Sequence, residues 1–380
     1  MALLKSLNKK PIKCPQVLKK SIKLVWNLMN AKVMFGMILA FVLTIFIRFY
    51  GSADPIEAEF QAFIIKYKRN YATINEYEFR KHVFKENLEF INNFNAQKHS
   101  WFLGINKFAD MTDQESDQIY ANDVPKKDYE GISLTNVLSN YSHSEDDIDW
   151  RLVRNKYIHK TKNQLACGSC WAFATNAAVQ TAWVIYNEQK LQKDIDAPDL
   201  SEQHLVDCET GSYGCNSGYV HKSMNYYLKN SPKYTKDYQY NAVDGYCKAN
   251  NTSDAIPVLK TWYQPIRYND RDMRFHLNYG VLTVDLRSVE KVFKFYAGGV
   301  IGDSDPKICG YKHTHDVTLV ASYTEPNGSR YWVLQNSWGE EWGEKGFVRI
   351  ARKSNYVGYK DWGVCGINDY AILPSYIEYN

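Results

Sequence analysis

Two stretches in the first quarter of the chain place apolar residues three and four positions apart. In residues 57–67 these are Phe60, Phe63, Ile64 and Tyr67, and in residues 75–96 they are Phe84, Leu88 and Ile91. This interval returns side chains to one face of a helix, so the pattern predicts two amphipathic helices. In the second stretch Glu76 stands four residues before Arg80, a pair that supports a helix by roughly 0.3 kcal/mol.

The second half of the chain has a different pattern. A helical stretch follows Cys170, and residues 281–286 alternate, with Leu282, Val284 and Leu286 on one face of a predicted strand. Residues 317–322 and 331–335 are further predicted strands, whereas residues 112–147 are polar and are predicted to form a linker. Helices that come first and strands that follow predict an α+β fold with two subdomains.

The N-terminal end is basic and then apolar. Residues 1–32 carry eight Lys and no acidic residue, and the uncharged segment 33–47 follows, between Lys32 and Arg48. Its length lies between the ~17–25 residues of a spanning helix and the ~7–15 residues of a signal-peptide core. The Lys-rich leader favours a cytoplasmic tail at 1–32 and a signal anchor at 33–49. Small residues at 51–53 favour a cleaved signal peptide instead, and both alternatives export the rest of the chain.

The composition indicates a folded, exported protein without a basic binding face. Hydrophobic residues make up 45% and aromatic residues 15% of the chain, which is enough for a large core and disfavours disorder. The net charge of +4 comes from the tail: without its eight lysines, 38 basic residues face 42 acidic ones. This balance argues against a nucleic-acid partner.

Seven of the eight cysteines follow the apolar segment. In an oxidising compartment an odd number leaves a thiol outside the disulfides, and that thiol is a candidate reactive group. Four Asn-X-Ser/Thr sequons, at Asn140, Asn250, Asn251 and Asn327, also suit an exported glycoprotein.

Residues 164–171, Gln-Leu-Ala-Cys-Gly-Ser-Cys-Trp, lead into the helical stretch. A thiol at a helix N-terminus faces unpaired backbone N–H groups and the positive end of the helix dipole, which both favour the nucleophilic thiolate. Cys167 and Cys170 could instead form a zinc site or a redox pair. A second cysteine pair at matching spacing and a βαβ pattern are both missing, so a nucleophilic Cys170 is the favoured interpretation.

The segment Cys-Gly-Ser-Cys-Trp resembles the signature around the catalytic cysteine of papain and the cathepsins. Downstream, His315 and Asn336, the latter in Asn-Ser-Trp-Gly, extend the resemblance. It implies that Cys170 attacks the scissile carbonyl, that His315 forms an ion pair with Cys170 and protonates the leaving amine, and that Asn336 orients the imidazole. Gln164 resembles the side-chain donor of the oxyanion hole, and Trp338 the indole that shields the His–Asn bond. His313 is a rival base, which the family pattern disfavours.

The same resemblance implies a papain-like two-domain fold, with a helical left domain around a long central helix and an antiparallel, barrel-like right domain. A helical prodomain would precede it, with an inhibitory propeptide at 50–142, a mature peptidase at 143–380 and cleavage within about 125–146. Ten positions match the propeptide of cathepsin L-like enzymes: Glu76, Arg80, Phe84, Asn87, Ile91, Asn95, Gly104, Asn106, Phe108 and Asp110. The implied disulfides are Cys167–Cys215, Cys208–Cys247 and Cys309–Cys365, which leave Cys170 as a thiol.

Residue-by-residue matching also implies a specificity pocket for the second substrate residue before the cut. Its predicted residues are Tyr219, Asp285, Asp316 and Tyr370, beside Gly218, whose backbone would pair with substrate. Asp285 and Asp316 stand where relatives have apolar residues, and two carboxylates there would favour a Lys or Arg side chain. Alternatively, one or both face solvent or pair with a resident cation. Ser217 replaces a family glycine, and we expect little effect.

The sequence therefore predicts a thiol-dependent endopeptidase, made as an autoinhibited zymogen, that hydrolyses proteins and peptides without a metal or cofactor. An exopeptidase of the same fold and an inactive, membrane-held binding homologue are the alternatives. The mature enzyme is expected to be a monomer. The catalytic part is expected to be lumenal or extracellular, tethered through residues 33–49, and the resemblance implies an acidic, lysosome-like vesicle.

Overall fold

The computed structural model describes residues 40–41, 55–120, 131–138, 147–153, 156–287, 291–302, 309–310, 312, 314–353, 356–357 and 360–379. The chain divides into two units, residues 1–70 and 71–380. In the first unit α3 spans Pro55–Tyr67, and the rings of Phe60 and Phe63 stack with centroids 6.2 Å apart. This helix confirms the first of the two predicted from the apolar spacing.

Within the described ranges, no helix has the length and apolar character needed to cross a bilayer. The Lys-rich tail and all of segment 33–49 except Ala40 and Phe41 lie outside those ranges. The signal anchor and the signal peptide therefore both stay predictions. His313 and Asn140 also lie outside the described residues.

The second unit begins with α4 (Ile74–Asn95), the second predicted helix. Its first turn is fixed by Thr73, whose side chain accepts the Glu76 backbone N–H, while the Glu76 carboxylate accepts the N–H of Ala72. These bonds satisfy N–H groups that a helix start leaves unpaired. The buried stripe of α4 contains Phe84, Leu88 and Ile91, as the spacing predicted.

The prediction of a linker at 112–147 is wrong in part, because two helices lie within it: α5 (Asp113–Tyr120) and α6 (Leu134–Val137). The start of α5 is a capping box. Thr112 accepts the Glu115 N–H through its hydroxyl, and the Glu115 carboxylate accepts the Thr112 N–H in return. A three-residue strand, β1 (Trp101–Leu103), precedes them and was not predicted.

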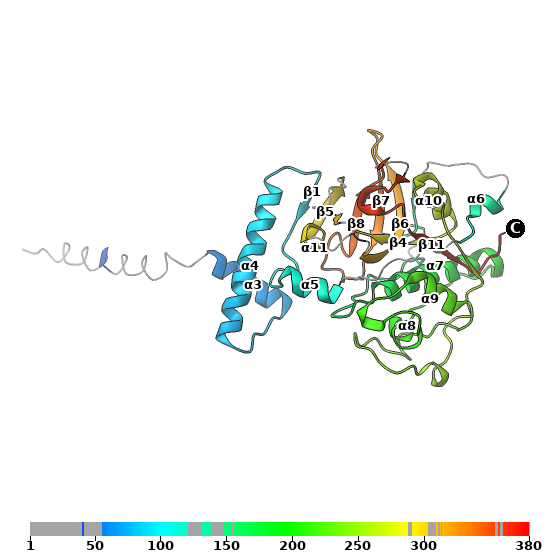
Figure 1. Ribbon diagram of the computed structural model, residues 1–380, viewed down its shortest axis with the longest axis horizontal. Coiled ribbons are helices and arrows are strands. Elements are labelled where there is room, and N and C mark those ends of the chain that lie inside the picture. Colours follow the sequence, from blue (N-terminus) through cyan, green and yellow to red (C-terminus); the bar gives the residue numbers. More distant parts are fainter. Residues whose placement is uncertain are drawn as a thin grey trace, which may run out of the picture. The chain divides into compact units, whose positions relative to one another are not determined.

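The helices of the C-terminal part gather around α7 (Cys170–Leu191). Figure 1 shows α8 (Glu202–Cys208) and α9 (Val220–Tyr227) beside it, and all three contribute to one apolar core that includes Trp171, Leu205 and Met224. Two further short helices, α10 (Asp270–His276) and α11 (Lys291–Lys294), lie near the sheet. Short 3-10 turns occur at Gly214–Asn216, Ala249–Asn251, Leu277–Tyr279 and Val364–Gly366.

Among the described residues, nine strands form one sheet in the order β1-β5-β8-β7-β6-β4-β11-β3, with β2 paired to β6. Their bounds, after β1, are β2 Ile148–Asp149, β3 Thr261–Tyr263, β4 Leu282–Leu286, β5 Tyr296–Ile301, β6 His315–Thr324, β7 Arg330–Gln335, β8 Phe347–Ala351 and β11 Ala371–Ser375. Only the β5–β8 pair is parallel among these pairs. A separate pair joins β9 (Tyr356–Val357) to β10 (Lys360–Asp361).

The three predicted strands correspond to β4, β6 and β7, and helices with a mostly antiparallel sheet confirm the α+β class. All five residues of β4 are buried, because α7 packs on the sheet through β4, β6 and β11. The side chains of β4 are therefore covered by protein on both faces. The alternation of apolar and polar residues along β4 does not mark a solvent-exposed face.

Candidate active site

Cys170 is the first residue of α7, and its side chain is buried. The turn before it is held by the Cys167–Cys215 disulfide and by the Gly168 N–H, which donates to the Cys215 carbonyl at 2.7 Å. Cys170 is outside the three disulfides that the described residues form. The chain thus holds a thiol at the positive end of a 22-residue helix, where the thiolate is favoured.

His315 and Asn336 come from neighbouring strands. His315 opens β6, Asn336 follows β7, and His315 Nε2 lies 2.7 Å from Asn336 Oδ1. The backbone N–H of Ser337 donates to the same Oδ1, which identifies that atom as an acceptor. The imidazole proton therefore sits on Nε2 and points at Asn336, so Nδ1 is the ring nitrogen left for other chemistry.

An aromatic cover lies over this pair. The Trp338 ring is 4.8 Å from the His315 ring, centroid to centroid, and is itself flanked by Phe293 and Trp342 at 5.7 and 5.1 Å. His315 and Asn336 are 0% and 3% exposed, so their hydrogen bond is shielded from water. A hydrogen bond in such a low-dielectric environment is stronger than the same bond in water.

Gln164 is fixed between Cys167 of the motif and Ser337. Its Nε2 donates to the Cys167 carbonyl at 2.8 Å, and its Oε1 accepts the Ser337 hydroxyl at 2.6 Å. The backbone joins the same two segments, because the Gln164 N–H donates to the Ser337 carbonyl. Since α7 packs against β6, the helix that carries Cys170 and the strand that carries His315 belong to one contact region. Ser337 stands in the Asn-Ser-Trp-Gly motif, but no spacing signal predicts its role in holding Gln164.

The predicted specificity residues line one pocket. Tyr219, Asp285, Asp316 and Tyr370 lie around it, together with Val220, His221, Thr283 and Val284. Asp285 on β4 is the direct cross-strand neighbour of Asp316 on β6, and both are at most 3% exposed. Gly218 lies against the Trp171 indole, where a Cβ would come within 2.4 Å of the ring. Ser217 has φ 139°, in the region that favours glycine, so its substitution for the family glycine carries backbone strain.

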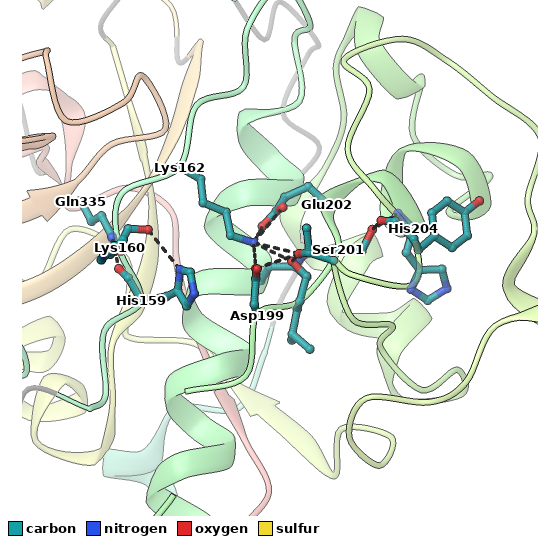
Figure 2. A network of polar contacts seen from close by, with 12 residues as sticks. His159, Lys160, Lys162, Asp199, Ser201, Glu202, His204 and Gln335 are labelled. Atoms are coloured by element: carbon teal, nitrogen blue, oxygen red, sulfur yellow. Dashed lines mark hydrogen bonds and ion pairs between the residues drawn. The ribbon is translucent and has the colours of Figure 1, made fainter. Parts of the chain in front are cut away.

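A partly buried ion cluster involves Lys162, two residues before Gln164 (Figure 2). Lys162 Nζ is 2.7 Å from Asp199 and 2.9 Å from Glu202. Burial raises the pKa of Glu202 despite its contact with Lys162. For Lys162, burial alone would lower the pKa, but the charges of Glu202 and Asp199 have the larger effect and raise it. We take Lys162 as charged, since two carboxylates share it, and Glu202 as the first to accept a proton in acid. Lys162 and Glu202 also line a cavity that reaches Asn336 and Asp316.

The propeptide motif ties α4 to the loop that follows β1. Asn87 donates to the carbonyls of Ala109 and Met111 at 2.9 and 3.1 Å, and Asn95 exchanges two bonds with Leu103. Arg80 contacts the Glu115 carboxylate at 2.7 Å and the Asp110 carbonyl at 3.0 Å, contacts that add to the local pairing with Glu76 predicted for it. Tyr71 donates to the Asp110 carboxylate.

The same loop contacts the catalytic part. Asn106 Nδ2 donates to the Lys294 carbonyl at 2.7 Å, and the Gly104 N–H donates to the Phe295 carbonyl at 2.9 Å. The β1 strand pairs with β5, with Trp101 opposite Gly299. Phe108 packs edge-on against Trp338 at 5.1 Å, and Lys107 reaches Asn163, the neighbour of Gln164. The propeptide thus lies on the aromatic cover of His315.

The other two disulfides, Cys208–Cys247 and Cys309–Cys365, are the pairings that the resemblance implied. All three bridges close loops of 39 to 56 residues, which lowers the entropy of the unfolded chain and stabilises the fold.

Comparisons with known proteins agree with this geometry. The family model described as papain family cysteine protease matches residues 144–375, and the cathepsin propeptide inhibitor domain (I29) matches residues 60–116. Cysteine protease XCP2 of Arabidopsis thaliana is 32% identical over 330 residues, covering 85% of this chain and 87% of that protein. Chymopapain of Carica papaya is 34% identical, covering 83% and 85%.

Solved proenzymes share the architecture. The structure titled recombinant stem bromelain precursor has a TM-score of 0.70 at 30% identity and covers 85% of this chain and 99% of its own. Digestive procathepsin L2 proteinase from Tenebrio molitor larval midgut has a TM-score of 0.70 at 27% identity, covering 84% and 99%. The chain belongs to the papain family of cysteine proteases and carries a cathepsin-type inhibitory propeptide.

Proposed function

We propose that this protein is the zymogen of an endopeptidase whose nucleophile is Cys170. The observation that carries the proposal is the His315–Asn336 bond, which leaves Nδ1 of a buried imidazole for the thiol on the adjoining helix. The thiolate attacks the scissile carbonyl carbon, and the C–N bond breaks as the imidazolium gives its proton to the leaving amine. Water, deprotonated by the neutral imidazole, then attacks the thioester, and the C–S bond breaks to release the acid and restore the Cys170 thiolate beside the His315 imidazolium.

Gln164 and the Cys170 backbone N–H are the proposed oxyanion donors. The Nε2 of Gln164 is held by the Cys167 carbonyl and its Oε1 by the Ser337 hydroxyl. The second Nε2 proton therefore has a fixed direction before the reaction, and no entropy is lost in ordering it in the transition state. Removing one such donor typically raises the barrier by about 3 kcal/mol. Gln164→Ala is expected to lower kcat by about 100-fold or more with a small change in KM.

The test is hydrolysis of an internally quenched peptide blocked at both ends, which an exopeptidase cannot use. Acid-matured enzyme should cleave it, and Cys170→Ser should neither cleave it nor react with a thiol-directed peptide epoxide. His159→Gln, a change at a histidine outside the proposed catalytic group, is the matched control and should keep both properties. Labelling of Cys170→Ser at another cysteine, or release of dipeptides only, would overturn the endopeptidase proposal.

We further propose that the specificity pocket prefers Lys or Arg at the second position before the cut. Like charges directly opposite each other on antiparallel strands repel, and the Asp285–Asp316 pair is of this kind. A cationic substrate side chain would relieve that repulsion, with Tyr370 and Tyr219 packing along its stem. Arg287 is the resident cation to consider, because Asp285 is among the charges that act on its guanidinium.

A substrate panel varied at that position decides this point. Arg and Lys should exceed Leu and Phe in kcat/KM by about 10-fold, and Asp316→Asn and Asp285→Asn should each reduce that ratio. Thr283→Val, which alters the same pocket without a change of charge, is the control. A preference for Leu or Phe in the unmodified enzyme would defeat the idea.

Export into the secretory pathway, an acidic vesicle and an N-terminal signal anchor complete the proposal. Three disulfides support an oxidising compartment, and the sequon residues Asn250, Asn251 and Asn327 are exposed. The boundaries at 32, 49 and 142 belong to this proposal too. N-terminal sequencing of the cellular protein, with a glycosidase mobility shift, tests both processing and export.

A further inference from the structure

The short segment Gly131–Leu138 is docked on the catalytic part through contacts that no propeptide motif position makes. The Gly131 N–H donates to Gln264 Oε1 at 2.6 Å, and the Gln264 N–H donates to the Ile132 carbonyl at 3.0 Å. A Cβ on Gly131 would lie 2.4 Å from the Trp262 ring, so the backbone approaches this indole as closely as only glycine allows. Gly131 and Ile132 are therefore held by the side chain and the backbone N–H of Gln264, respectively.

The next two residues are buried against α10. Figure 1 shows α6 beside α10, and Leu134 and Ser133 are 0% and 3% exposed. Ser133 Oγ donates to Asp272 Oδ2 at 3.1 Å, and the Leu134 backbone N–H donates to His276 Nε2 at 3.0 Å. Burial of a leucine and four hydrogen bonds make this a built docking site rather than a passing contact.

The tautomer of His276 follows from its two partners. Nδ1 lies 2.8 Å from the Asp272 carbonyl oxygen, which can only accept, so Nδ1 carries the proton. Nε2 is then bare and accepts the Leu134 N–H. An imidazolium carries a proton on both nitrogens, so its Nε2–H would face the Leu134 N–H, donor against donor.

Asp272 is the ionisable neighbour of His276 within the described residues. Its Oδ2 lies 3.6 Å from Nδ1, and it also accepts the Ile266 N–H and the Ser133 hydroxyl. Burial lowers the pKa of His276 below its ordinary 6.5, although the Asp272 charge and carbonyl act in the opposite direction. The docked imidazole is therefore neutral at pH 7, in agreement with the tautomer that the hydrogen bonds require.

We infer that residues 131–138 form a clasp, which fastens the chain between the inhibitory domain and the catalytic domain to α10, and that a proton on His276 Nε2 opens it. Its partners Gln264, Asp272 and His276 are none of the proposed catalytic residues. The inference rests on the proposed zymogen in one respect only, because the clasp lies within the region where maturation cleavage is expected. A closed clasp holds this backbone in hydrogen bonds to the catalytic part, and an open clasp leaves it free to enter a protease cleft.

The pH dependence follows from linkage. Once the clasp opens, His276 is exposed and its pKa returns toward the ordinary 6.5, so opening takes up a proton. As pH falls below about 6.5, the open-to-closed ratio rises by up to about tenfold per pH unit, until the docked histidine itself titrates. Above that pH the clasp keeps its full stability.

Native-state hydrogen exchange on the full-length Cys170→Ala chain tests this without any need for catalysis. Leu134 and Gln264 N–H report on the clasp, and Val300 N–H, bonded to the Ser100 carbonyl, reports on the β1–β5 contact. After correction for intrinsic rates, protection at Leu134 and Gln264 should fall by about tenfold or more from pH 7 to pH 5. Protection at Val300 should change much less over the same range.

His276→Gln is the matched variant, since its amide can donate to the Asp272 carbonyl and accept from Leu134 but does not titrate. Its protection at Leu134 should vary by less than about twofold between pH 7 and pH 5. If this variant fails to fold, the ring carbon shifts of His276 in the Cys170→Ala chain replace it, and their midpoint must coincide with clasp opening. Unchanged protection at pH 5, or an equal loss in His276→Gln, would overturn the clasp, whatever the outcome of the proteolysis assays.

Discussion

The propeptide is held at two regions that use opposite kinds of chemistry. The first, formed by α4, β1 and α5, combines the buried Trp101 with charged and partly exposed pairs: Arg80 and Glu115 are 22% and 34% exposed, and Lys294 reaches Asp113 and Asp117, which are 55% and 47% exposed. The second, the clasp at 131–138, relies on a neutral imidazole that is 0% exposed. One region needs its groups charged and the other needs its group uncharged.

The two regions therefore respond to acid in different pH windows. The hydrogen bond from Arg80 lowers the pKa of Glu115 from 4.5 to about 2. Its contribution to stability is complete above pH 4.5 and is lost as the pH falls toward 2. The clasp loses stability already below about pH 6.5. Mild acid thus loosens the chain within the expected cleavage region while the inhibitory domain stays folded.

The largest effect is expected from Trp101→Ala, which breaks the first region only. Trp101 is 2% exposed and packs against Phe94 and Tyr296 from opposite parts of the chain. Loss of a buried indole costs about 3 kcal/mol or more, so exchange at Val300 and Gly104 N–H should rise by about 100-fold in the Cys170→Ala background. Leu134 protection should be unchanged. Coupled loss at both regions would show that they open as one unit.

Leu134→Ala is the corresponding change in the clasp, with the next largest effect. Its side chain is fully buried, and truncation should cost about 2 kcal/mol, which raises exchange at Gln264 N–H by roughly 30-fold. Because His276 is intact, the dependence on pH should persist on top of this offset. Leu138→Ala, at a half-buried position of the same segment, is the control and should have little effect. If the Gln264 amide of Leu134→Ala exchanges as slowly as in the parent, burial of Leu134 does not stabilise the clasp.

Glu115→Gln is expected to have a smaller effect, confined to one pH window. A partly exposed pair of this type contributes about 1 kcal/mol or less. The variant should be less stable than the parent by the same amount at pH 7 and pH 5, and the difference should shrink between pH 4.5 and pH 2, as Glu115 in the parent takes up its proton. Thermal unfolding of both Cys170→Ala chains measures it. A difference that disappears already between pH 7 and pH 5 would contradict the assigned window.

Much of the first region could be predicted from the sequence, and almost none of the second. The spacing of Phe84, Leu88 and Ile91 marks α4, and the resemblance identified Asn106 and Asp110 as inhibitory positions. The helical signal is local, because a helix repeats its buried face within four residues. Asn106, Asp110 and the specificity pocket were accessible for a different reason: matching to a family transfers contacts that local pattern does not contain.

The clasp lies beyond both sources of information. His276 and Leu134 are 142 residues apart, and one hydrogen bond between a side chain and a backbone amide leaves no periodic trace. The helix α6 has four residues, so its existence depends on Ser133 as its cap and on docking rather than on propensity. The Lys162–Glu202 contact could not be predicted for the same reason, because its partners are 40 positions apart in the sequence. The start of α5 did have a local signal, the capping box from Thr112 to Glu115, which was missed within a polar stretch.

The smallest effect is expected from Lys294→Met, and it separates the two regions by salt rather than by pH. Met keeps the buried stem but removes the contacts to Asp113 and Asp117, while the Lys294 carbonyl still accepts Asn106. Ser116, which also contacts the ammonium, keeps its bond to the Asp113 carbonyl, so no buried hydroxyl is orphaned. The cost should be below about 1 kcal/mol, and it should fall further in 1 M salt, where the screening length is about 3 Å instead of about 10 Å. In the parent, salt should therefore raise exchange at Gly104 N–H slightly and leave Leu134 N–H unaffected, because a neutral imidazole has no charge to screen. Equal salt sensitivity at both amides would mean that the clasp depends on charge after all, and the contrast between the two regions would be lost.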